Sequence, residues 1–243
     1  LLILLILDSV SILSACIVYF NCQGFINNKD EICILINDWK PKIVLLSETH
    51  LCADINNCEI SIEGYRYEQC VTNNKRTGGV IAFIREDVKY KLINVRCALN
   101  FAWLLSIEHL NCGIKYHFTV IYHPPQKENA LFIDFFNGYL DEISTYDGIN
   151  VIFGDFNYNL LKQTYYGDKF KEAIFKHGLT QIVNAPTRVT ENSQTLIDHI
   201  ITNHTQLKHE VHTAPRISDH YILSVQMENS IKEDLINLSL IHI

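Results

Sequence analysis

The heptapeptide VIFGDFN at residues 151–157 constrains the fold of this chain more than any other stretch. Three apolar residues lead directly into Gly-Asp-Phe-Asn, which is typical of a buried strand that ends at a sharp bend. Gly154 permits a tight backbone there. In an extended chain Asp155 and Asn157, two residues apart, point to the same face of a sheet. A plain turn is the competing interpretation, because Gly, Asp and Asn are common turn residues.

Other short apolar runs also end in polar residues. The run ACIVYF at residues 15–20 is followed by Asn21, and the run IVLL at residues 43–46 is followed by Ser-Glu-Thr-His, which contains Glu48. Apolar spacing between them predicts a helix that ends before the Lys-Pro step at residues 40–41. The three elements form a βαβ unit, and open α/β sheets place ligands at such strand exits.

Further elements follow the same patterns along the chain. The strand HFTVIY ends at Tyr122 before a double proline, and Asp198 falls in the middle of a predicted strand at residues 195–201. Residues 53–64 are polar and predict an exposed loop. The remaining predictions are strands at 80–84, 103–108 and 221–225, and amphipathic helices at 128–143 and 168–177, the second capped by Gly178.

Size and composition favour one globular unit. A chain of 243 residues, 48% hydrophobic and 19% charged, can bury a large core, so disorder is not expected. The formal net charge of -7 argues against a nucleic-acid partner, because phosphate contacts usually need a basic surface. Carboxylates gathered around a divalent metal would weaken this objection, since the bound ion reverses the local field.

The eight cysteines form no C-x-x-C pair, so we expect free thiols in a reduced, intracellular protein.

The chain starts at Leu1 rather than Met, and we expect its true beginning to be missing. Residues 1–14 form an apolar segment without the pattern of a signal peptide. A membrane span over residues 1–20 would place Asp8 in lipid at a cost of about 3 kcal/mol, so no membrane association is expected.

The polar residues at strand ends suggest a common chemistry. A carboxylate such as that of Asp198 inside an apolar strand needs a partner, because an unpaired buried charge is costly. His220, which follows Asp219 just before the last predicted strand, is the natural candidate. Such a pair would hold the imidazole in one tautomer and raise its proton affinity.

Carboxylate and amide oxygens suit Mg²⁺ better than zinc. A magnesium site with a histidine and an aspartate is what metal-assisted phosphodiester hydrolysis requires. Asp155 would then orient or deprotonate the attacking water, while the neutral donors Asn157 and Tyr122 would bind the phosphate.

In chain order the motifs N, E, Y-x-P-P, GDFN, ID and SDH resemble the endonuclease/exonuclease/phosphatase family. The chain is most similar within it to the apurinic-type endonuclease domain of non-LTR retrotransposons. The resemblance covers residues 15–227, leaves 228–243 as a tail, and implies a DNase I-like fold, a two-sheet α/β sandwich flanked by helices. The supporting stretches are LLSETHL (45–51), RTGGVIAFIR (76–85), VIYHPP (120–125) and PTRVTENSQTLIDHIITN (186–203).

The resemblance also implies a role for each matching residue. Two positions depart from the family pattern: Gln23 stands where relatives often have Asp or Asn, and His123 where an Arg commonly precedes the double proline. These changes put a metal-side contact and a basic DNA contact in doubt. With His50, His117 and His199, we expect His123 to be structural or at the surface. The resemblance implies that Glu48, Asn21 and Asp219 bind Mg²⁺, with Mn²⁺ as an alternative. It implies that Asn157, Tyr122 and His220 contact the phosphate. Asp155 would activate the nucleophile, and Asp198 would orient His220.

Three functions stay open at this point. The first is a Mg²⁺-dependent endonuclease that nicks DNA and leaves a 3′-hydroxyl from which a reverse transcriptase of the retrotransposon would prime. That partner would be a domain lost or absent from this chain, and the resemblance implies action in the nucleus, although no targeting signal is readable. The second is a phosphatase or nucleotide hydrolase of the same fold, which the acidic charge favours. The third is an inactive remnant of such an element.

Overall fold

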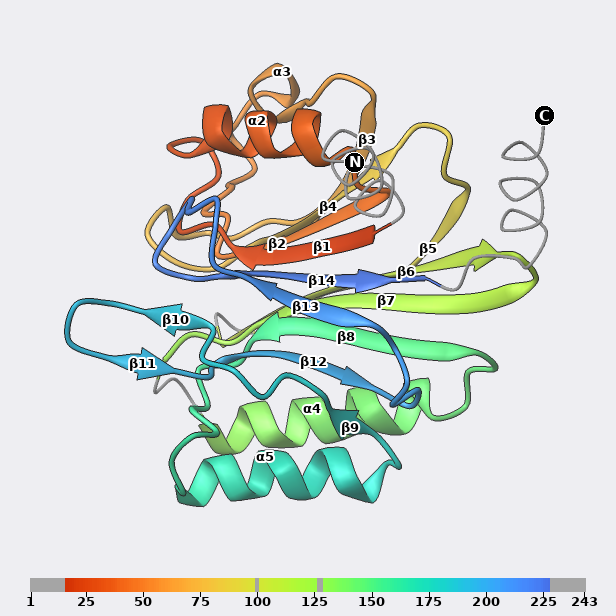
Figure 1. Ribbon diagram of the computed structural model, residues 1–243, viewed down its shortest axis with the longest axis vertical. Helices are drawn as coiled ribbons and strands as arrows, with labels where there is room; N and C mark the ends of the chain where they lie inside the picture. The colour runs from red at the N-terminus through yellow and green to blue at the C-terminus, as the bar shows by residue number, and fades with distance from the viewer. Residues whose placement is uncertain (1–15, 99–100, 126–128, 228–243) are drawn as a thin grey trace, which may run out of the picture.

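The computed structural model describes residues 16–98, 101–125 and 129–227. The chain forms two six-stranded sheets packed face to face, with helices on the outer face of each (Figure 1). This is the predicted two-sheet α/β sandwich, and the fold class is confirmed.

The first sheet mixes strands from both ends of the chain. Helices α2 (Lys29–Trp39) and α3 (Asn57–Ile60) lie on its outer side (Figure 1). In spatial order its strands are β13 (His209–His212), β14 (Ile222–Gln226), β1 (Cys16–Asn21), β2 (Ile43–Ser47), β4 (Val80–Arg85) and β3 (Tyr65–Cys70).

The second sheet is built from the middle of the chain. Helices α4 (Asn129–Ile143) and α5 (Tyr165–Lys176) cover its outer face, and the hairpin of β10 (Arg188–Val189) and β11 (Gln194–Thr195) projects beyond its edge (Figure 1). Its strands are, in order, β5 (Tyr90–Ala98), β6 (Ala102–Asn111), β7 (Ile114–Tyr122), β8 (Ile149–Asp155), β12 (Asp198–Thr202) and β9 (Thr180–Gln181).

The pleat of the central strands sorts their side chains between layers. Val151 and Phe153 of β8 belong to the core between the two sheets, while Ile152 packs in the layer below α4 and α5. Because successive side chains point to opposite faces, Asp155 continues the intersheet face. The same alternation brings Asn21 at the end of β1 to the intersheet side.

Large aromatic side chains fill the space between the sheets. Trp103, Phe118 and Phe153 are fully buried there. Full burial of a large apolar side chain contributes on the order of 2 kcal/mol or more to folding. The intersheet core is therefore the main contact holding the sandwich closed.

The structure corrects two predicted elements and contains strands that were not predicted. Asp198 is the first residue of β12 rather than the middle of a strand, because the pairing of β12 with β8 starts at Asp198 opposite Asp155. The predicted loop at residues 53–64 contains the short helix α3, which begins with a capping box of Asn56 and Glu59. Strands β5 and β13 were not predicted, because none of their residues is fully buried and neither forms an apolar run.

Several predictions concern the ends of the chain and its cysteines. The N-terminal segment 1–14 and the tail 228–243 lie outside the described residues. Over the ranges that are described, no helix has the length and apolar character needed to cross a membrane. All eight cysteines are free thiols, as expected from their spacing.

Gly154 serves close packing rather than the tight bend predicted for it. A Cβ atom at Gly154 would lie 2.3 Å from the carbonyl oxygen of Ile121 and 2.9 Å from the ring of Phe156. The bend occurs at Asn157, whose φ is 55°. Gly154 therefore allows β7 and the Phe156 ring to approach the end of β8 closely.

We expect Gly154→Ala to destabilise the protein by about 1–3 kcal/mol, because an added methyl group would overpack this contact. Gly138→Ala is the matched control, since nothing lies within 4 Å of its Cβ position in α4. Alanine in a helix interior should raise stability by up to about 1 kcal/mol. Urea unfolding of both variants checks this, and equal stabilities would contradict it.

His199 is a buried core histidine, as predicted. Its Nε2 donates to the carbonyl oxygen of Tyr158 at 3.0 Å, and its Nδ1 accepts from the side-chain amide of Gln181 at 2.9 Å. The ring packs on Phe156 and Phe170. Burial lowers the pKa of His199 to about 4. Both ring nitrogens are thus satisfied in the neutral form.

This environment predicts a pH-dependent contribution to stability. The unfolded chain binds a proton at His199 near pH 6.5 and the folded chain only near pH 4, so the stability gained at neutral pH is lost as pH falls between those values. His199→Gln removes the titration. The stability difference between wild type and this variant should shrink by about 3 kcal/mol from pH 7.5 to pH 4. Urea unfolding at both pH values measures it, and a constant difference would be inconsistent with the prediction.

Candidate active site

The predicted strand-exit residues meet at one edge of the sandwich. Strands β1 and β2 run parallel with Asn21 opposite Ser47, and β7 and β8 run parallel with Tyr122 opposite Asp155. Asp155 also lies opposite Asp198 across the antiparallel pair β8 and β12. Both sheets therefore deliver polar side chains to the same region between them.

The amide of Asn21 connects the acidic residues of the two sheets. Its Nδ2 donates to Glu48 Oε2 at 2.7 Å and to Asp155 Oδ2 at 2.8 Å. Its Oδ1 accepts from the backbone nitrogen of Gln23 at 3.0 Å. Asn21 is completely buried, so these contacts fix its orientation. Glu48 and Asp155 are therefore neighbours, although 107 positions of chain separate them in the sequence.

Glu48 lies just beyond the end of β2 in a left-handed backbone conformation, with φ of 54°. Its Oε1 is 3.5 Å from His50 Nε2. Burial alone would raise the pKa of Glu48, but the nearby His50 and the hydrogen bond from Asn21 outweigh it and lower the pKa. Glu48 is therefore an ionised carboxylate at neutral pH. His50, expected to be structural or at the surface, is a neighbour of the site.

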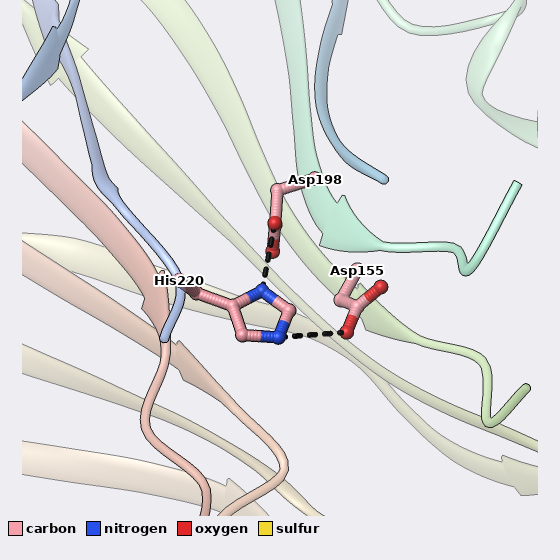
Figure 2. Close-up of side chains that lie close together, drawn as sticks. All are labelled: Asp155, Asp198 and His220. Carbon is pink, nitrogen blue, oxygen red and sulfur yellow. Dashed lines mark hydrogen bonds and ion pairs between the residues drawn. The ribbon is translucent and has the colours of Figure 1, made fainter. Parts of the chain in front are cut away.

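His220 lies between two carboxylates, as Figure 2 shows. Its Nδ1 is 2.8 Å from Asp198 Oδ2, and its Nε2 is 4.0 Å from Asp155 Oδ2. The other oxygen of Asp198 accepts from the hydroxyl of Tyr19 at 3.2 Å. The predicted Asp198–His220 contact is present. It fixes the proton on Nδ1 and leaves Nε2 turned toward Asp155.

The charges of this group shift both proton affinities. Burial and the negative charge of Asp198 raise the pKa of Asp155, against the opposing effects of His220 and Asn21. Burial would lower the pKa of His220, but the carboxylates of Asp198, Asp155 and Asp219 raise it to about 9. Asp155 is thus a stronger base than an ordinary aspartate, and His220 is cationic at neutral pH.

Tyr122, the last residue of β7, lies beside these carboxylates. Its hydroxyl is 3.5 Å from Thr77 Oγ1, and the side chain is buried. Burial, followed by the charges of Glu48 and Asp155, raises the pKa of Tyr122 far above its ordinary value. Tyr122 therefore stays a neutral hydroxyl donor, as predicted.

Asn157 lies at the bend after β8. Its backbone nitrogen donates to Asp155 Oδ1 at 3.0 Å, and its Nδ2 donates to the carbonyl oxygen of His123 at 2.8 Å. The extended geometry assumed for Asp155 and Asn157 ends at Asp155, so the strand and turn interpretations each describe part of the heptapeptide. The bend still brings Asn157 beside Asp155.

Asp219 is held by Arg188, which the sequence did not single out, and by Gln23, which it marked only as a departure from the family pattern. Its Oδ2 accepts from Nε of Arg188 at 2.8 Å and lies 2.8 Å from Nη2 of the same side chain. Its Oδ1 accepts from Nε2 of Gln23 at 2.7 Å. Both oxygens are engaged, so the role predicted for Asp219 at the metal finds no free ligand atom in this arrangement. Only the PTRVT stretch that contains Arg188 marked this region beforehand.

His123 has a structural environment. It is completely buried, and its Nδ1 donates to the carbonyl oxygen of Phe101 at 2.7 Å. The imidazole stacks on Phe132 with ring centroids 4.0 Å apart, and burial lowers its pKa. His123 therefore presents no positive charge at the surface.

The residues fit a hard divalent cation. Ligand atoms of Asp155, Asp198 and His220 lie within 4.8 Å of one another. However, both oxygens of Asp198 already accept hydrogen bonds. The pKa of Asp155 is raised by burial and then by the negative charge of Asp198, and a cation would oppose both effects. On the more open side, Glu48 and Asp155 offer carboxylate oxygens, which Mg²⁺ and Mn²⁺ prefer, while Asn21 turns its amide nitrogen to both carboxylates.

Comparison with known proteins agrees with this architecture. Residues 116–224 match the family model described as endonuclease-reverse transcriptase. No curated protein sequence gives a match. The endonuclease domain of TRAS1, a telomere-specific non-LTR retrotransposon, is 14% identical with a TM-score of 0.69, and the match covers 88% of this chain and 99% of that domain.

Two further solved structures share the fold. An endonuclease/exonuclease/phosphatase family protein from Leptotrichia buccalis is 15% identical with a TM-score of 0.64, covering 88% of this chain and 99% of its own. An AP endonuclease from Archaeoglobus fulgidus is 16% identical with a TM-score of 0.63, with the same coverages of 88% and 99%. Residues 116–224 therefore resemble an endonuclease-reverse transcriptase family, and the described chain shares its fold with these solved structures.

Proposed function

We propose that this protein is a metal-dependent phosphodiesterase that nicks DNA as the endonuclease of a non-LTR retrotransposon. One observation carries the proposal: the Asn21 amide joins Glu48 to Asp155, and His220 Nε2 faces the same Asp155. A carboxylate suited to a metal (Glu48), a basic carboxylate (Asp155) and a cationic imidazole (His220) thus lie next to one another. Phosphodiester hydrolysis needs these three groups together.

Glu48 would be the main ligand of Mg²⁺, with Mn²⁺ as the alternative ion, and Asn21 beside it would orient the Glu48 carboxylate through its Nδ2. When bound, the ion would supply positive charge for the phosphate oxygens and the leaving oxygen. Glu48 suits this role because its carboxylate is ionised and 21% of the side chain remains accessible.

Asp155 would take a proton from the attacking water. Hydrogen bonds from the Asn21 side chain and the Asn157 backbone fix its carboxylate. Burial and Asp198 raise its proton affinity, which improves a general base. The rigid carboxylate would also orient the water before the proton leaves it.

His220 and Tyr122 would bind the phosphate. Asp198 holds the Nδ1 proton of His220, so the cationic ring presents its Nε2 proton as a donor. Tyr122 adds a neutral hydroxyl whose raised pKa prevents ionisation beside the phosphate. Asn157 would contribute its side-chain amide from the bend after β8.

DNA is the proposed substrate because the matched family model couples an endonuclease to a reverse transcriptase, and TRAS1 is described as a non-LTR retrotransposon. A reverse transcriptase would then use the nicked end, and the site of action would be the nucleus. The net charge of -7 favours a phosphatase or nucleotide hydrolase instead. Release of inorganic phosphate from a small phosphate ester, without nicking, would select that alternative.

With Mg²⁺ present, we expect the purified protein to convert supercoiled plasmid to the open circular form. Asp155→Asn and His220→Ala should each lower the rate by about 10²–10⁴-fold, because each removes a proton-transfer or phosphate-binding group. Asp134→Asn, an exposed substitution on α4, is the control and should nick at the wild-type rate. Intact plasmid with the wild-type protein would refute the proposed function.

Glu48→Gln should raise the Mg²⁺ concentration needed for half-maximal nicking by about tenfold or more, because the amide keeps the shape but loses the charge. Glu63→Gln, at an exposed position, is the control and should leave the requirement unchanged. Titration with Mg²⁺ and Mn²⁺ after removal of metal by EDTA measures the effect. An unchanged requirement in Glu48→Gln would exclude Glu48 as the main ligand.

A further inference from the structure

We infer that Arg188 is a positioning residue that, together with Gln23, holds Asp219 away from the Nε2 of His220. The imidazole proton is thereby kept free for the substrate phosphate. The inference rests on the proposed phosphodiesterase function and adds a role for two residues outside the catalytic group.

His220 Nε2 has two acidic neighbours and a hydrogen bond to neither. Asp219 Oδ1 lies 3.6 Å away and Asp155 Oδ2 lies 4.0 Å away. Both distances exceed those of a nitrogen–oxygen hydrogen bond. Since Nδ1 is already bonded to Asp198, Nε2 is the ring position left for a ligand.

Asp219 is the group that could occupy Nε2. It is the sequence neighbour of His220, and a small rotation of its side chain would shorten the 3.6 Å separation. A carboxylate bonded to a cationic imidazole forms a strong, charge-assisted hydrogen bond. Such a bond would remove the proton that the phosphate needs.

Three donors oppose this rotation. Arg188 presents Nε and Nη2 to Oδ2, and Gln23 donates to Oδ1 from the loop after β1. The two side chains approach Asp219 from different elements. They satisfy both of its oxygens and hold the carboxylate in place.

The backbone around Arg188 is hydrogen-bonded to the residues before and after His220. Arg188 and His220 form an isolated antiparallel bridge. The backbone nitrogen of Val189 donates to the Asp219 carbonyl at 3.1 Å, and that of Tyr221 donates to the Thr187 carbonyl at 2.6 Å. These backbone hydrogen bonds therefore fix the segment that places the Arg188 guanidinium beside Asp219.

Arg188 could instead bind the substrate phosphate directly, because 39% of its side chain is accessible. The two roles differ in what Asp219 does after Arg188 is removed. A positioning role predicts that the loss arises from the freed carboxylate and disappears when that carboxylate is neutralised. A direct phosphate contact predicts a loss that no change at Asp219 restores.

Plasmid nicking at saturating DNA distinguishes these roles. Arg188→Ala should lower kcat by about 10–100-fold, the usual effect of removing a group that orients a site residue. Arg188→Lys should recover little, since lysine lacks the two-donor fork. The double variant Arg188→Ala/Asp219→Asn should recover most of the rate, because an amide competes weakly for the imidazolium. A double variant as slow as Arg188→Ala would overturn the inference.

Arg96→Ala is the matched control. Arg96 pairs with Glu142 between β5 and α4, and its side chain is 40% accessible, close to the 39% of Arg188. It should keep the wild-type rate. Gln23→Leu removes one hydrogen bond to Asp219 and leaves the β10–β11 hairpin, which carries Arg188, unchanged. It should lower kcat in the same direction as Arg188→Ala. This second variant keeps the inference testable if Arg188→Ala does not fold.

A measurement independent of activity uses the side-chain ¹⁵N resonances of His220 at one fixed pH. Arg188→Ala should shift the Nε2 resonance toward that of a hydrogen-bonded nitrogen, and the double variant should return it to the wild-type position. An unchanged resonance in Arg188→Ala would overturn the inference. If the wild-type protein does not nick DNA, the proposed function fails, while these spectra still decide whether Arg188 holds Asp219.

Discussion

The face-to-face contact of the two sheets determines where every site residue lies. Side chains that point inward along β1, β2, β7 and β8 are apolar in the middle of each strand and polar at its last position. The closed apolar core thus continues into Asn21, Tyr122 and Asp155 at one edge. No long loop is needed to bring these groups together, because the packing of the strands already fixes them.

The chemistry at this edge of the sandwich depends on carboxylates that lie close together. Asp198, Asp155 and Asp219 surround the imidazole of His220 and raise its pKa against the effect of burial, while burial and the charges of Asp198 and Glu48 raise the pKa of Asp155. The same carboxylates behave differently according to their partners. Asp198 is buried and accepts from Tyr19 and His220, and Asp219 accepts from Arg188 and Gln23, whereas Glu48 accepts from the neutral amide of Asn21. Hydrogen-bond partners, rather than residue type, separate a supporting acid from one available to a cation.

The sequence predicted the elements whose patterns are strong. Buried strands such as β1, β2 and β8, and helices such as α4, follow from apolar runs and helical periodicity. The contact between Asp198 and His220 followed from the cost of an unpaired buried carboxylate. The contacts of Arg188 and Gln23 with Asp219 could not be predicted, because they join segments 31 and 196 positions apart and leave no local pattern. The edge strands β5 and β13 were missed since one or both of their faces are exposed.

The position of β14 affects the order in which the molecule can assemble. This strand, the last of the described chain, lies between β13 and β1 in the first sheet, and its pairing with β1 completes the hydrogen bonds of the first strand. A growing polypeptide therefore leaves one side of β1 open until residues 222–226 have left the ribosome. His220 arrives only with the same segment. Completion of the first sheet beside β1 and completion of the chemical centre therefore both wait for the same segment of the chain.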